Sequence, residues 1–263
     1  MTVTGLALCL AVVSLNSEKV LPEMLWRGVR EKLNMLDLYT QQRNPSYVAG
    51  HSGIASASGL YNYGERKTRF IFDQLLMAQE QGRLPDAPVS CESGFNAGHS
   101  AIVFLQAMPL RSSHYEFSFG GHPGWRKVAP YELQNAAFFR SVFGPRFNYI
   151  DGDTNVTLRN FAESAPEIKC DVVFVDGAKG TAARANDLNL FRAISKPGAM
   201  VFGDEIDTVS CASGQDNPTG CTTFGRTALA YHKAVRSGFL KYESCSHEAR
   251  TRWDLVCLWS FLQ

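Results

Sequence analysis

The chain has 263 residues, a formal net charge of +1 and 19% charged residues. This length suits one large α/β domain with a buried core, with at most a small appended segment. The charge is too balanced for a nucleic-acid surface or an acidic tail, so we expect a small-molecule partner and no nucleic acid. The sequence does not indicate an oligomeric state.

An apolar run at Leu6–Val13 has the length of a signal-peptide core. No lysine or arginine precedes it, and a membrane span needs about 20 apolar residues. We therefore expect a buried first segment, with a signal or anchor within residues 1–15 as the alternative. Residues 1–84 are expected to form a helical cover, in which Gly64–Gly82 is the clearest amphipathic stretch, ahead of a main domain at residues 85–263.

Seven cysteines are scattered through apolar runs and loops, with no CxxC pair and no metal-ligand spacing. The pattern predicts buried free thiols in a reducing compartment, and hence a cytoplasmic location. The odd count also argues against a complete disulfide framework. The cysteines are Cys9, Cys91, Cys170, Cys211, Cys221, Cys245 and Cys257.

After residue 85, short apolar strands alternate with helical stretches, and only a polar turn separates the last two strands. This order predicts an α/β fold: a Rossmann-like, seven-stranded, mostly parallel sheet with helices on both faces and a C-terminal antiparallel hairpin. The expected strands are 89–93, 115–120, 147–151, 171–177, 199–205, 239–246 and 253–261. The expected helices include 101–108, 125–142, 182–193 and 224–237.

A glycine-rich turn, CESGFNAGHS at Cys91–Ser100, follows the first of these strands. Its glycines would let the backbone approach a ligand, and the helix after it would offer N–H groups to an anion. The turn is neither a G-x-G-x-x-G dinucleotide loop nor a P-loop, which counts against a nicotinamide dehydrogenase. Its pattern is E-x-G-x-x-x-G-x-S.

Together with the strand order, this turn resembles motif I of the class I S-adenosylmethionine (SAM)-dependent methyltransferases, over roughly Pro88 to the C-terminus. The resemblance implies that the turn wraps the methionine part of SAM, and that Glu92 contacts the cofactor's amino group directly or through water. The cofactor-binding residues that it implies are Glu92, Gly94, Phe95, Asn96, Gly98, Ser100, Gly120, His122, Asp153, Thr154 and Asp176.

A second segment, FVDGAK at Phe174–Lys179, resembles the FVDADK of metal-dependent catechol and caffeoyl-CoA O-methyltransferases. The resemblance implies a magnesium site of Asp176, Asp204 and Glu205, with Asp176 and Lys179 as catalytic residues. Independently, two carboxylates that converge at the ends of adjacent strands need a cation or a proton between them. Hard oxygen ligands suit Mg²⁺, which leaves positions for substrate oxygens such as those of a diol.

Two positions depart from the family pattern. Glu205 stands where the catechol-type enzymes have asparagine, and this adds a negative charge around the metal. Gly120 stands where the family has an acid that holds the ribose hydroxyls, so we expect His122 or a water to take one hydroxyl and SAM binding to be weak. We expect Gly120→Asp or Gly120→Glu to tighten it.

The sequence therefore predicts a SAM-dependent O-methyltransferase, assisted by Mg²⁺, that acts on a small hydroxylated molecule. Two alternatives stay open. In one, methyl transfer proceeds without metal and Asp176 and Asp204 position the substrate. In the other, a methyltransferase-fold protein with weakened catalysis serves as a binding or scaffold module. The acceptor is not identified, and the polar loop at Thr208–Thr223 is expected to close over it.

Overall fold

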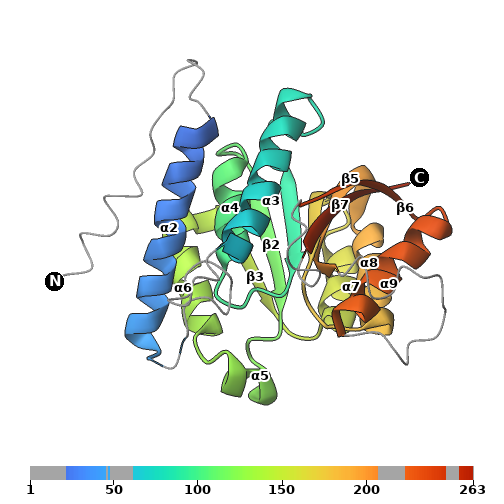
Figure 1. The fold of residues 1–263 in the computed structure, drawn as a ribbon. Coiled ribbons are helices and arrows are strands. Elements are labelled where there is room, and N and C mark those ends of the chain that lie inside the picture. Colours follow the sequence, from blue (N-terminus) through green and yellow to red (C-terminus); the bar gives the residue numbers. More distant parts are fainter. Residues whose placement is uncertain (1–21, 46, 48–61, 207–222, 247–254, 263) are drawn as a thin grey trace.

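The computed structural model describes residues 22–45, 47, 62–206, 223–246 and 255–262. One sheet of seven strands in the order β3-β2-β1-β4-β5-β7-β6 forms the centre of the molecule (Figure 1). The strands are β1 (Val89–Ser93), β2 (Ser113–Ser118), β3 (Phe147–Asp151), β4 (Cys170–Val175), β5 (Ser195–Ile206), β6 (Leu240–Cys245) and β7 (Leu255–Phe261).

The strand directions confirm the predicted fold class. β1 to β5 pair in parallel, whereas β7 runs antiparallel to both β5 and β6. Every residue of β4 is buried, as expected for a parallel strand with helices on both faces. The chain order reverses between β1 and β4, and ligands bind beside such a switch point at the carboxyl ends of the strands.

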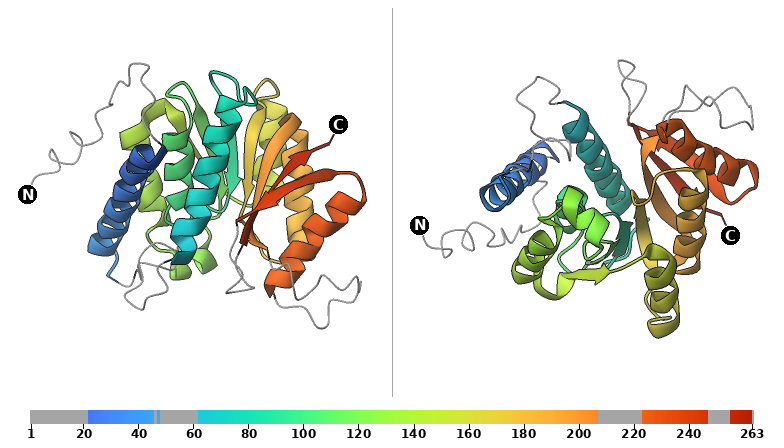
Figure 2. Two further views of the ribbon diagram at one scale, coloured as in Figure 1. Left: turned by 45° about the horizontal axis from the view of Figure 1, so that its top comes forward. Right: turned by 90° about the horizontal axis from the view of Figure 1, so that it is seen from below.

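Helices cover both faces of the sheet (Figure 2). One face carries α2 (Pro22–Arg43), α3 (Asn62–Glu80), α4 (His99–Ala107) and α6 (Glu132–Phe143), and the other carries α7 (Thr154–Ser164), α8 (Thr181–Ala193) and α9 (Thr223–Arg236). A separate apolar core lies on each side. Phe72, Phe104 and Phe139 are buried in the first core, and Phe191 and Tyr231 in the second.

The helix expected at residues 125–142 is divided in two, α5 (Pro123–Val128) and α6. Pro130 lies in the break between them. A proline has no backbone N–H, and it disfavours the helical conformation of the residue before it, so the chain turns at this point. The sequence-based helices also omitted α7 and a short 3₁₀ helix, η1 (Gly144–Arg146).

Disulfides join four of the cysteines, so the prediction of free thiols is wrong for these positions. Cys91 pairs with Cys170 at a Cα–Cα distance of 5.9 Å, and Cys245 with Cys257 at 3.9 Å. Each pair brings two strands together, β1 with β4 and β6 with β7. Sequence separations of 79 and 12 carry no recognisable motif, so the pairing depends on strand register.

The N-terminal segment contributes α2 and α3, which share the apolar core of α4 and α6. Its division from the main domain at residue 84 stays a prediction. The apolar run at residues 6–13 lies outside the described residues, as does the expected acceptor loop up to residue 222. Among the helices of the described residues, none has the length and apolarity to cross a bilayer.

Candidate active site

The glycine turn after β1 is tied to the neighbouring strands by its backbone. Gly94 N–H donates to Phe117 O at 3.2 Å, and Phe95 N–H donates to Ser118 Oγ at 3.2 Å. Gly94 has φ +101°, and a Cβ there would lie 2.8 Å from Asp176 O. Both the positive φ and this close approach require glycine. The turn is therefore packed directly against the end of β4.

The second half of the turn leads into α4. Asn96 has φ +49°, and its side chain accepts a hydrogen bond from the Tyr131 hydroxyl at 2.6 Å. Gly98 has φ +95° and precedes α4 without a side-chain cap, and a Cβ there would lie 2.7 Å from the rings of Phe95 and Phe139. The first N–H groups of α4 thus have no capping side chain, a feature that favours an anionic group of a ligand.

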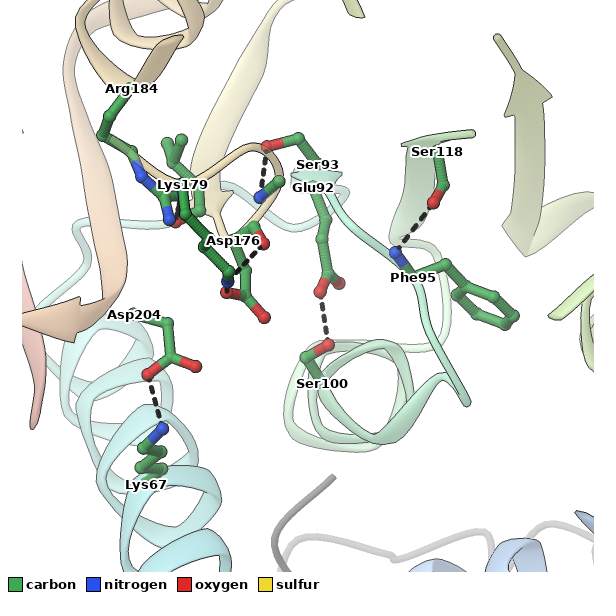
Figure 3. Close-up of polar contacts among 12 residues, drawn as sticks. Lys67, Glu92, Ser93, Phe95, Ser100, Ser118, Asp176, Lys179, Arg184 and Asp204 are labelled. Carbon is green, nitrogen blue, oxygen red and sulfur yellow. Dashed lines mark hydrogen bonds and ion pairs between the residues drawn. The ribbon is translucent and has the colours of Figure 1, made fainter. Parts of the chain in front are cut away.

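Glu92 lies beneath this turn and is completely buried. One carboxylate oxygen accepts a hydrogen bond from Ser100 Oγ (Figure 3). The other lies 3.4 Å from His114 Nε2. Burial raises the pKa of Glu92. These contacts show that Glu92 supports the turn and the start of α4, while its contact with SAM stays a prediction.

The Asp176–Lys179 pair forms at the end of β4, where Asp176 N–H donates to Ser93 O at 3.0 Å. Lys179 Nζ lies 2.7 Å from Asp176 Oδ1 and 3.1 Å from its carbonyl oxygen. Burial raises the pKa of Asp176, and the charge of Lys179 opposes that shift. The spacing of three residues therefore brings the two side chains together at this strand end, as the sequence pattern indicates.

Asp204 lies near the end of β5, and its charge also raises the pKa of Asp176. Its carboxylate forms an ion pair of 2.8 Å with Lys67, and the two side chains are 13% and 15% exposed. Figure 3 shows Asp176 and Asp204 at the same edge of the sheet, each bonded to its lysine. The backbone of Glu205 continues β5, but its side chain lies outside the described part of the chain.

Lys67 is a site residue that the sequence analysis missed. It belongs to α3, in an N-terminal segment with no recognisable motif, and its side chain contacts Asp204. A lysine within the amphipathic stretch at residues 64–82 was the only signal, and such lysines are ordinarily solvated. Two carboxylates and two ammonium groups therefore meet at this edge of the sheet.

The space around Gly120 corrects one sequence-based expectation. Gly120 N–H donates to the Tyr149 hydroxyl at 3.2 Å, and that hydroxyl donates to Glu132 Oε1 at 2.7 Å. A Cβ on Gly120 would lie 2.3 Å from the Tyr149 oxygen. Tyr149 and the buried Glu132 thus fill the volume that a longer side chain would need. The expected gain in SAM affinity from Gly120→Asp conflicts with this packing.

Three further candidates have local structural partners. His122 caps α5 by accepting a hydrogen bond from Gly124 N–H at 3.2 Å. Asp153 caps α7, and Thr154 Oγ1 donates to Asp187 Oδ1 at 2.9 Å. These bonds account for the residue types without a ligand. Their roles in cofactor binding remain predictions.

Asp151 ends β3 and pairs in register with Ser118, the last residue of β2. Its side chain is exposed, and Oδ1 accepts a hydrogen bond from Gly121 N–H at 2.8 Å. The family pattern places this acid on β2 and not on β3, so the sequence gives no signal for Asp151. Its position makes it a candidate for the missing ribose contact.

Comparison with known proteins agrees with this architecture. Residues 91–206 match the family model described as a methyltransferase domain. No curated protein matches the sequence. The matched region runs from the glycine turn to the end of β5, so it includes Glu92, Asp176 and Asp204.

Several solved structures share the fold at low sequence identity. An O-methyltransferase from Bacillus cereus in complex with SAH has a TM-score of 0.54 and 11% identity, over 98% of this chain and 97% of that chain. A putative O-methyltransferase from Klebsiella pneumoniae has a TM-score of 0.53 and 16% identity, over 97% of this chain and 94% of that chain. The O-methyltransferase TomG from Streptomyces achromogenes, involved in tomaymycin synthesis and in complex with SAM, gives 0.54 and 16%, over 89% and 99%.

The chain therefore has the class I methyltransferase fold, and the match of residues 91–206 to the methyltransferase-domain model agrees with the resemblance drawn from the sequence.

Proposed function

We propose that this protein transfers a methyl group from SAM to a hydroxyl oxygen of a small molecule. The observation that carries the proposal is the contact between the glycine turn and the end of β4. Gly94 packs against the backbone of Asp176, so a ligand held by the turn lies next to the Asp176–Lys179 pair. A cofactor site and a set of acid–base groups thus share one edge of the sheet.

Different residues bind the cofactor and assist the loss of the acceptor proton. The turn at Gly94–Gly98 and the N-terminus of α4 bind the methionine part of SAM. The acceptor hydroxyl lies by Asp176, Asp204 and their lysines, where its oxygen attacks the sulfonium methyl and its proton leaves to a nearby base. Holding the two reactants in line supplies much of the rate increase, and the charged groups assist the loss of the proton.

The donor chemistry of Asp176 and Asp204 fits a magnesium ion, because both offer hard carboxylate oxygens at neighbouring strand ends. Together with Glu205 they would hold it, and when bound it would acidify the acceptor hydroxyl. The ion pairs of Asp176 with Lys179 and of Asp204 with Lys67 support the metal-free form of the reaction instead, because each carboxylate already has a cationic partner. The two forms differ in how the acceptor proton is lost.

Removal of divalent metal tests this proposal. We expect SAM binding, measured by calorimetry, to persist when excess chelator is added to the folded protein, because the glycine turn supplies no ligand of the proposed magnesium ion. Methyl transfer to a panel of phenols and catechols should fall on chelation and return with Mg²⁺. Full activity in chelator would support the metal-free form of the reaction, in which Asp176 and Asp204 each pair with a lysine. Absence of SAM binding would refute the proposed enzyme and leave the scaffold alternative.

Asp151 supplies a second test. If its carboxylate holds the ribose in place of the acid absent at Gly120, Asp151→Asn should weaken SAM binding by about tenfold or more, since a charge-assisted hydrogen bond contributes roughly 1.5 to 3 kcal/mol. Glu163→Gln, on the exposed surface of α7, is the matched control and should leave the affinity unchanged. Equal SAM affinities in Asp151→Asn and the wild type would assign the ribose contact to another group.

A further inference from the structure

Three polar side chains form a buried cluster on the sheet, on the face covered by α4. Glu92 lies on β1 directly opposite Glu116 on β2, and His114 lies two residues before Glu116 on the same strand. All three are completely buried. His114 Nε2 lies 3.4 Å from Glu92 Oε2 and 3.6 Å from Glu116 Oε2, and one donor atom from each residue lies within 4.8 Å of the others.

The donor atoms of this cluster face one another and have no hydrogen-bond partner outside the cluster among the described residues: these atoms are Glu92 Oε2, His114 Nε2 and both carboxylate oxygens of Glu116. The Glu92 and Glu116 carboxyls are close enough to share a proton. The walls are apolar, because the imidazole ring is stacked between Phe104 and Phe147, with centroid distances of 5.5 and 5.9 Å. Buried polar atoms are costly when they are left unsatisfied, so an occupant is expected between them.

The hydrogen bond of the histidine favours a cation as that occupant. Nδ1 lies 2.8 Å from Ser90 Oγ. When Nδ1 carries the proton and donates it to Ser90, the lone pair of Nε2 faces two carboxylates. Metal-binding histidines have this arrangement, with the second ring nitrogen donating to an oxygen.

We propose that Glu92, His114 and Glu116 bind a divalent transition-metal ion, with Zn²⁺ as the best fit. In tetrahedral zinc sites with bonds of about 2.1 Å, neighbouring ligand atoms lie about 3.4 Å apart. The two measured distances from His114 Nε2, 3.4 and 3.6 Å, match this spacing. Two carboxylates and a neutral imidazole also balance the charge of one divalent ion. The second oxygen of Glu116 also has no hydrogen-bond partner, and it could complete the coordination by making this carboxylate bidentate.

Such a site would be structural and separate from the carboxylates at the strand ends. Its ligands are all buried, whereas a catalytic metal keeps a position open to water or substrate. It would join β1 to β2 directly beneath the glycine turn, and through Ser100 it would fix the start of α4. The proposal does not depend on the proposed methyl transfer.

Protons on the two carboxyls are the alternative to a metal ion in this cluster. Burial raises the pKa of Glu92 and of Glu116, so both carboxyls can be protonated instead of metal-bound. Glu116→Gln separates these two states. Glutamine keeps the size and hydrogen-bonding capacity of a protonated glutamate but is a poor ligand for zinc. In the protonated state this substitution is neutral or stabilising, whereas in the metal-bound state it removes the ion together with the stability that the ion provides.

The experiment measures metal content and thermal stability of the full chain without SAM. After refolding with excess Zn²⁺ and removal of free metal, the wild type should contain about one zinc per chain by mass spectrometry. Glu116→Gln should contain almost none and melt at a lower temperature, and refolding the wild type in chelator should lower its melting temperature toward that of the variant. Asp176→Asn is the control for the strand-end carboxylates and should retain the zinc.

A wild type without stoichiometric zinc would overturn the proposal, as would Glu116→Gln that melts at or above the wild-type temperature. Loss of the zinc in Asp176→Asn would also overturn it, by assigning the ion to the other site. If Glu116→Gln does not fold, the zinc contents of the wild type and Asp176→Asn decide. Because no step uses SAM or an acceptor, failure of this proposal is distinguishable from failure of the proposed function.

Discussion

Replacing Asp204 with asparagine should lower the turnover number by about a hundredfold or more while leaving SAM affinity nearly unchanged. Asp204 holds Lys67 at 2.8 Å and faces Asp176, so its carboxylate sets the charge around the acceptor hydroxyl. Gly94 of the glycine turn packs against Asp176 at the end of β4, so the cofactor site should keep its shape. The substitution therefore removes an interaction that matters during methyl transfer.

The matched control for Asp204→Asn is Asp171→Asn. Asp171 lies at the opposite end of the neighbouring strand β4, where it forms an ion pair of 2.7 Å with Lys196. Like Asp204, Asp171 lies on the sheet and forms an ion pair with a lysine, but it lies away from the proposed site. Steady-state kinetics with saturating SAM should show normal turnover for Asp171→Asn. Equal turnover numbers in both variants and the wild type would remove Asp204 from the mechanism.

The sheet could be predicted from the sequence because its signals are local. Short apolar runs separated by helical stretches define parallel strands, and the turn HEART at residues 247–251 leaves no room for a helix between the last two strands. The strand boundaries moved by a few residues, as for β2, which covers 113–118 instead of 115–120. These shifts alter neither the strand order nor the edge of the sheet at which the site lies.

The candidate site could be predicted where its parts are close in sequence. Asp176 and Lys179 are three residues apart and form a contact, and the convergence of Asp204 on Asp176 follows from strand order. Lys67 could not be placed, because its contact with Asp204 depends on how α3 packs. The packing of Tyr149 and Glu132 against Gly120 could not be predicted either, because these two residues come from other elements.

The cysteines illustrate the same limit. Cys91 and Cys170 lie on adjacent strands in the sheet but 79 residues apart in the chain. Spacing rules recognise short disulfide and metal motifs, and they do not recognise pairs that only sheet register brings together. The buried triad of Glu92, His114 and Glu116 was missed for this reason too, because its members come from two strands.

Replacing Gly94 with alanine should weaken SAM binding by about tenfold or more and lower stability by about 1 to 3 kcal/mol. A side chain at this positive φ is strained, and its Cβ would lie 2.8 Å from Asp176 O. The turn must move away from β4, which alters both the cofactor loop and the position of Asp176. Calorimetry with SAM and thermal denaturation measure the two effects.

Gly82→Ala separates backbone strain from the change at the site. Gly82 also has a positive φ, +67°, but a Cβ there would meet nothing within 4 Å, and it follows α3 on the surface. This control should lose less stability than Gly94→Ala, because only the positive φ disfavours its side chain, and it should bind SAM as the wild type does. If Gly94→Ala is folded at the assay temperature and also binds SAM like the wild type, the glycine turn is not the cofactor loop. The contact of Gly94 with Asp176 would then serve the packing of the two strand ends.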